Sequence, residues 1–192
     1  MQDDELFLIV DAVKEGLIET AKSVFPETGV VPTPQIHCFS PDSPKGLIGY
    51  AVCRDYTRGP DAGVAIGSLG ILADAMDADL VVLMWEEADL RTSLYGPSDE
   101  HPTGIVILEA TLDAHELSWY PFTFTVIGHN AEGLPRLNVR FGEPSHTEGA
   151  ALPPVIEQLL GEWRSHQIDT LEEAQAMVRG AQADGYQVRF TT

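Results

Sequence analysis

Cysteine and lysine are both scarce in this chain of 192 residues. Cys38 and Cys53 are the two cysteines, and they do not form a Cys-x-x-Cys pair. Two such cysteines make no disulfide framework, so a small disulfide-rich secreted domain is excluded. Pro41-Asp42 resembles the first dipeptide of a nuclease motif whose second part is Asp-x-Lys or Glu-x-Lys, but the third and last lysine of the chain is Lys45. With no lysine downstream, a nuclease motif that ends in Asp-x-Lys or Glu-x-Lys is excluded as well.

Long apolar runs are also missing. The longest, Leu80 to Trp85, has six residues, whereas a membrane-spanning helix needs roughly 18. The first residues are Met1-Gln2-Asp3-Asp4-Glu5, which are acidic where a secretory signal requires positive charge. We therefore expect a cytoplasmic protein with buried thiols and no membrane partner.

Positive charge is the third scarcity. Lysine and arginine total 11 against 30 aspartates and glutamates, which gives a net charge of −19. A surface that binds nucleic acid or an anionic membrane needs clustered basic residues, so we expect no direct binding to DNA, RNA or membranes. Three origins of the acidity remain open: adaptation to solubility or high salt, mimicry of a phosphate backbone, and compositional drift.

Added sodium chloride is expected to raise the melting temperature of this protein. At neutral pH its 30 carboxylates face 11 cations, so self-repulsion opposes the folded state and screening relieves it. Thermal melts from low to high NaCl test this. A flat or falling melting temperature would mean that the carboxylates are already paired locally.

The hydrophobic pattern predicts helices and strands, with several strands following one another after residue 103. Helical spacing predicts helices over 3–25, where Pro26 would end the helix, over 60–78, from 153 to 163, and over 171–184 behind a Thr170/Glu173 capping box. Alternating or continuous apolar runs predict strands at 35–39, 47–53, 80–85, 104–112, 119–127, 135–141 and 187–190. We expect one α+β (mixed α/β) domain spanning 1–192, with a single mixed sheet of six or seven strands and helices packed on it.

Two of these helices carry specific packing predictions. A stripe of small residues, Gly63, Gly67, Gly70 and Ala73, should let another element approach the second helix closely. In the last helix, the apolar side chains are expected to face the core; they are Leu171, Ala174, Met177, Val178 and Ala181.

No assembled catalytic set is visible. None of the six histidines has the spacing of a metal site, and there is no Gly-x-Ser-x-Gly elbow, so we expect no metal and no cofactor. Glu86 and Glu87 close a buried strand, which is a common place for active-site carboxylates. The alternative is that they cap the strand end or begin a helix.

Arg54 and Arg58 flank a loop that leads from a strand into a helix N-terminus, and they are the candidate anion-binding residues. Free backbone N–H groups and the helix dipole favour an anion there, and arginine can hold one with two hydrogen bonds. The alternative is that Asp55 and Asp61 neutralise both arginines locally.

A second small basic group lies on one predicted strand face: Arg136, Asn138 and Arg140. It is suited to an acidic partner or to a second copy of the chain, or it is an ordinary solvated face.

These patterns favour a non-enzymatic interaction or regulatory protein that binds a protein partner or self-associates through a sheet face or the small-residue helix. Two alternatives stay open. One is a small enzyme acting on a phosphorylated or carboxylated substrate near Arg54 and Arg58. The other is an acidic mimic of nucleic acid that inhibits a DNA- or RNA-processing protein.

Overall fold

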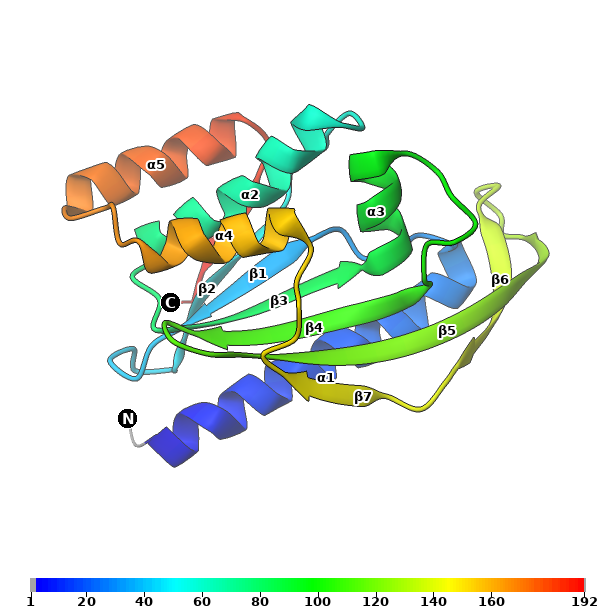
Figure 1. The fold of residues 1–192 in the computed structure, drawn as a ribbon, viewed down its shortest axis with the longest axis horizontal. Helices are drawn as coiled ribbons and strands as arrows, with labels where there is room; N and C mark the ends of the chain where they lie inside the picture. Colours follow the sequence, from blue (N-terminus) through cyan, green and yellow to red (C-terminus); the bar gives the residue numbers. More distant parts are fainter. Residues whose placement is uncertain (1–2, 192) are drawn as a thin grey trace.

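The computed structural model describes residues 3–191, which form an eight-stranded sheet with five helices (Figure 1). The helices are α1 (Asp3–Thr28), α2 (Pro60–Ala75), α3 (Glu87–Tyr95), α4 (Pro154–Arg164) and α5 (Leu171–Ala183). The strands are β1 (Gln35–Phe39), β2 (Leu47–Val52), β3 (Leu80–Glu86), β4 (Gly104–Thr111), β5 (His115–His129), β6 (Pro135–Phe141), β7 (Ser145–Glu148) and β8 (Gln187–Phe190). The predicted α+β class is confirmed.

The sheet has the strand order β6-β5-β4-β3-β1-β2-β8, and β7 pairs with the first part of β5, on the same edge as β6. Every pairing among residues 3–191 is antiparallel, which corrects the expectation of a mixed sheet. The reason lies in the crossover through α2. It connects β2 to β3, which run in the same direction, but β1 is inserted between them. A β-α-β sequence thus gives no parallel neighbours here.

The eighth strand, β7, exceeds the predicted six or seven. Its four residues are all exposed and polar or charged, so the sequence there has no apolar alternation to indicate a strand. Pairing with β5 alone holds it in the sheet, from Glu116↔Glu148 to Trp119↔Ser145.

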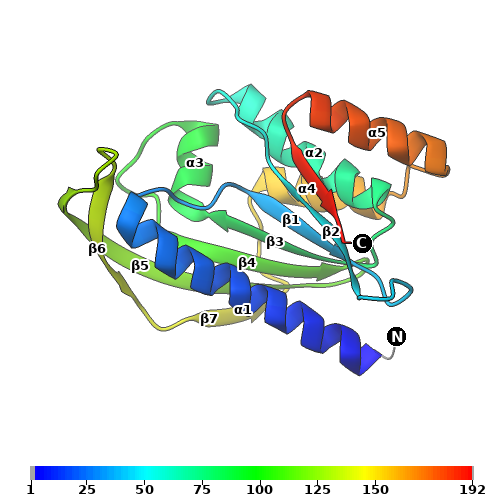
Figure 2. The same ribbon diagram turned by 180° about the vertical axis from the view of Figure 1, so that it is seen from behind.

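Helices cover the two faces of the sheet unequally. Helices α2, α4 and α5 lie on one face, and α1 crosses the other (Figures 1 and 2). Each side has its own apolar cluster, one under α2 and α4 and one under α1 and β6. Strand β3 lies between them and is buried along its whole length, as its continuous apolar run predicts. None of the helices in residues 3–191 is long and apolar enough to cross a membrane.

The small-residue stripe on α2 packs against α4, as predicted. At Gly70 the approach is so close that an added Cβ would lie 2.1 Å from the backbone oxygen of Leu159. The stripe is therefore occupied within the chain at this point.

Two helix predictions need correction. Helix α1 continues through Pro26 to Thr28, because Gly29 donates its N–H to the Phe25 carbonyl and closes the last turn with a positive φ of 62°. In α5, whose Thr170 cap is confirmed, only Val178 is buried, and Leu171 and Met177 are exposed. This helix lies at the margin of its layer (Figure 1), and only part of its apolar face is buried.

Candidate functional site

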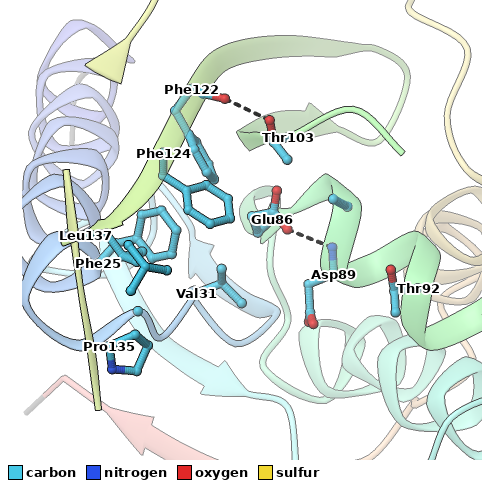
Figure 3. Close-up of a pocket in the computed structure, with 13 residues that line it drawn as sticks. Phe25, Val31, Glu86, Asp89, Thr92, Thr103, Phe122, Phe124, Pro135 and Leu137 are labelled. Carbon is cyan, nitrogen blue, oxygen red and sulfur yellow. Dashed lines mark hydrogen bonds between the residues drawn. The ribbon is translucent and has the colours of Figure 1, made fainter. Parts of the chain in front are cut away.

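A cleft of about 380 Å³ opens between the β5–β6 hairpin, the end of α1 and the start of α3 (Figure 3). Thirteen residues line it: Phe25, Gly29, Val31, Glu86, Ala88, Asp89, Thr92, Thr103, Phe122, Phe124, Val126, Pro135 and Leu137. This volume is within the range of small-molecule sites and also accommodates one or two side chains of a partner protein.

One side of the cleft is aromatic. The ring of Phe25 lies 4.9 Å from that of Phe122 and 5.9 Å from that of Phe124, centroid to centroid. Phe25 and Phe122 are buried, whereas Phe124 is 46% exposed and presents its ring to the cleft. The loop after α1 packs closely against the start of β6, since a Cβ at Gly29 would lie 2.5 Å from the ring of Pro135.

The opposite side of the cleft carries carboxylates (Figure 3). Glu86, at the end of β3, caps α3 by accepting the backbone N–H of Asp89 at 2.6 Å. Its other carboxylate oxygen accepts the N–H of Gly104 at 3.0 Å, which ties the start of β4 to the end of β3. Burial raises the pKa of Glu86, and these backbone donors oppose that rise. Glu86 therefore has a structural role, as the sequence alternative for this position proposed.

Asp89 differs from Glu86 because it lies in the first turn of α3, where the helix dipole favours its charge, but its side chain caps no backbone group in the described part of the chain. Among residues 3–191 its carboxylate has no hydrogen bond or ion pair, although the side chain is half-buried in the cleft wall. Burial raises the pKa of Asp89, and only the more distant charge of Arg58 opposes this rise. The Asp89 carboxylate is therefore a charge at the cleft wall that is still available to a cation from outside.

The two candidate anion-binding arginines lie near this cleft but have different surroundings. Arg54 forms an ion pair with Asp61 at 2.6 Å, and this hydrogen bond lowers the pKa of Asp61 to about 2. Asp61 also accepts the N–H of Thr57 at 2.7 Å, so a carboxylate of the chain already occupies the place predicted for an anion. Arg58 is exposed. The structure thus gives the anion site no support of its own.

A second hollow of about 310 Å³, lined by Arg54 and Tyr56, adjoins the cleft and shares Val31 and Asp89 with it. Asp89 therefore lies where the two depressions meet. A ligand that reached Asp89 would also contact the loop that contains Arg54. The Arg54 guanidinium itself is already paired with Asp61.

The second basic group lies on the exposed side of β6. Arg136 forms an ion pair with Glu27 of α1 at 3.1 Å, while Asn138 and Arg140 are exposed. Leu137, which points the other way, lines the cleft instead. The alternation predicted for this strand is confirmed, but the structure does not join these three polar residues to the cleft.

Other polar clusters are internally satisfied. The hollow beside Trp119 and Pro153 contains Glu87, whose carboxylate accepts from Trp85 at 2.7 Å and Arg91 at 2.6 Å. No group of three or more metal-binding side chains occurs within the described part of the chain, residues 3–191.

A serine–histidine contact occurs between β5 and β7. Ser118 lies 2.8 Å from Nδ1 of His146, and Glu116 lies 3.7 Å from the same nitrogen. A catalytic triad needs the serine and the acid at opposite ring nitrogens. Ser118 is also buried, so this cluster does not present a nucleophile.

The sequence pattern indicates Glu86 in one wall of the cleft, at the end of the buried strand, and does not indicate the other wall. It gives no reason to expect a role for Asp89, which lies three residues further on. The signal that could have drawn attention to it is its place in the first turn of a short helix directly after the core strand. The aromatic wall joins Phe25 with Phe122 and Phe124, which are remote in sequence, and no spacing rule brings them together.

Comparison with protein-family models, with curated proteins and with solved structures found no match for this chain. The chemistry of the cleft therefore carries the functional argument.

Proposed function

We propose that this protein is a non-enzymatic interaction protein whose cleft binds a positively charged group attached to an apolar body. The observation that carries the proposal is the half-buried Asp89 carboxylate, which has no hydrogen-bond or ion-pair partner within residues 3–191 and lines a cleft whose opposite wall is aromatic. Apolar and charged side chains line the same cleft, so one ligand can contact both.

The aromatic wall favours the same ligand. Phe25, Phe122 and Phe124 supply apolar area, and the faces of their rings attract cations. A cation between these rings and Asp89 would be favoured from both sides. Removing apolar surface from water contributes about 25 cal/mol per Å² of it.

The charge of the whole chain acts in the same direction. A net charge of −19 attracts cationic ligands and basic protein partners and repels acidic ones. This long-range attraction speeds encounter, and the cleft supplies the specific contact.

The cleft has the composition of a binding site rather than a catalytic one. Within the described residues its polar side chains are Glu86, Asp89, Thr92 and Thr103. Glu86 holds two backbone segments, and Thr103 donates its hydroxyl to the Phe122 carbonyl at 2.7 Å. These roles support binding without chemistry.

The variant Asp89→Asn is expected to lose the preference for cations. We expect the wild-type protein to bind 3-phenylpropylammonium and to discriminate against 3-phenylpropanoate, which has the same ring and the opposite charge. A hydrogen bond to a charged group contributes about 1.5–3 kcal/mol, so the variant should bind the amine at least ~10-fold more weakly. Isothermal titration calorimetry at fixed ionic strength measures both ligands.

Asp169→Asn is the matched control, because it removes the same charge from an exposed position between α4 and α5. Equal weakening by both variants would mean that the amine senses only the net charge, and the proposal would fall. Affinity should also decrease as the pH falls from about 6 to about 4, since burial raises the pKa of Asp89 and protonation removes the charge that the amine needs.

A further inference from the structure

Strand β5 extends well beyond the strand that pairs with one of its edges. Its pairing with β4 ends at Gly104↔Pro121, whereas its pairing with β6 on the other edge continues to His129↔Pro135. Among residues 3–191 no strand pairs with the β4-side edge of β5 after Phe122. The part of β5 after Phe122, here called the β5 arm, therefore has one open edge, and the cleft lies beside it (Figure 3).

The backbone groups on this open edge can be assigned from the hydrogen bonds next to it. Phe122 donates its N–H to the Thr103 carbonyl and accepts the Thr103 hydroxyl on its own carbonyl, so its peptide groups point to the β4 side. The preceding residue, Pro121, accepts from Gly142 on the β6 side. Peptide groups alternate between edges along a strand, so those of Phe124 and Val126 point to the open side.

The side chains on this arm are also unusually exposed for apolar residues. Phe124 is 46% exposed, Val126 58% and Ile127 63%. A register shift between Val126 and Gly128 marks a bulge, which ends the regular edge there. The open edge is therefore short, from Thr123 to Val126, and borders the cleft with an apolar rim.

We propose that this edge receives an extended segment of a basic partner protein as an added strand. This inference rests on the proposed function and names the partner that would deliver the cation. The segment would continue the line of β4 beyond Gly104 and bond to the backbone of Phe124 and Val126. Its side chains alternate between faces, so every second one enters the cleft: an apolar one against the phenylalanines, and a lysine or arginine at Asp89.

Charge decides between a foreign partner and a second copy of this chain. Two copies would each bring a net charge of −19 to the contact, which repels them, whereas a basic segment is attracted.

The test follows the backbone amides of the intact protein by hydrogen exchange with NMR detection. In the free protein, the amides of Phe124 and Val126 should exchange fast, while those of Thr123 and Thr125, opposite β6, should be protected. The probe is acetyl-Thr-Leu-Thr-Lys-Thr-Leu-Thr-amide, with a glutamate version in place of the lysine as control. On binding the lysine peptide, Phe124 and Val126 should slow at least ~10-fold.

N-methylation of the peptide separates backbone pairing from side-chain binding. The backbone N–H groups of the peptide point alternately toward β5 and away from it. N-methylation of the set that points toward β5 should abolish binding, and N-methylation of the other set should leave the affinity unchanged. On the protein side, Val126→Pro removes the N–H and should weaken binding far more than Val126→Ala, which keeps it. Thermal melts of both variants check their folding, and the peptide series stands even if Val126→Pro does not fold.

Each other outcome overturns the inference in a distinguishable way. If both N-methylated peptides bind as well as the parent and the two amides stay unprotected, the cleft binds side chains only, and the proposed function stands without strand addition. If the amine binds but the peptide does not, the cleft takes a small cation. If the two amides of the free protein become protected as its concentration rises, a second copy occupies the edge. If neither amine nor peptide binds, the proposed function fails as well.

Discussion

Gly70→Ala is expected to lower the stability of the protein by about 2–3 kcal/mol, since overpacking of a tight contact costs that much. The added Cβ would lie 2.1 Å from the Leu159 oxygen and 2.9 Å from its carbonyl carbon, and both atoms are backbone. No rotamer change relieves such a clash, so α4 would have to move away from α2. In a domain of this size the melting temperature should fall by about 5–10 °C.

Gly161→Ala is the matched control, because it makes the same change within α4, at a position where no atom lies within 4 Å of the new Cβ. Alanine is the better helix former by about 1 kcal/mol, so this variant should be as stable as the wild type or more stable. Chemical denaturation of both variants measures the difference. Equal stability of the two would contradict the close packing of α2 on α4.

The second large effect is acid destabilisation through His37. This side chain is 9% exposed, stacks on Tyr50 at 5.3 Å, and has a buried Nδ1 without a hydrogen-bond partner in residues 3–191. Burial lowers the pKa of His37 from 6.5 to about 4. The unfolded chain therefore takes up this proton at a higher pH than the folded protein does.

Stability from this residue is fully present above pH 6.5 and is lost as the pH falls toward 4. The whole difference corresponds to about 3 kcal/mol. His37→Phe keeps a ring against Tyr50 and removes the titration, so wild type should lose about 2–3 kcal/mol more than the variant between pH 7 and pH 4.5. Urea unfolding at several pH values gives these energies. Parallel pH profiles for the two proteins would show that His37 is not the cause.

Acidic groups do not confuse this comparison. Burial raises the pKa of Glu86 and Asp89, which favours the folded state as the pH falls, in the opposite direction to His37. Both carboxyl groups are present in wild type and variant alike. The difference between the two profiles therefore isolates the histidine.

The elements of the fold were largely predictable because each depends on local spacing. The buried strand follows from the apolar run Leu80–Trp85, the start of α5 from the capping box at Thr170, and the close helix packing from the small residues around Gly70. Strand direction was not predictable in the same way. The insertion of β1 between β2 and β3 depends on long-range pairing, and β7 consists of polar residues without a strand pattern.

The candidate site was less accessible to sequence reasoning than the fold. Arg54 was noticed for its charge, but its ion pair with Asp61 became visible only when their 2.6 Å separation was known. Asp89 is of interest because no group in residues 3–191 forms a hydrogen bond or ion pair with its carboxylate. Whether a carboxylate has such a partner depends on the tertiary structure and cannot be predicted from the sequence. The open edge of β5 arises because β4 begins only at Gly104, so its pairing with β5 stops at Pro121. How far two strands pair depends on the tertiary structure and not on local spacing.

The measurement that most directly tests the proposed binding site is the position of 3-phenylpropylammonium on the protein, determined by crystallography of the complex. The account predicts the ammonium nitrogen within hydrogen-bond distance of the Asp89 carboxylate and the phenyl ring among Phe25, Phe122 and Phe124. An amine scattered over the acidic surface, with the cleft empty, would contradict it.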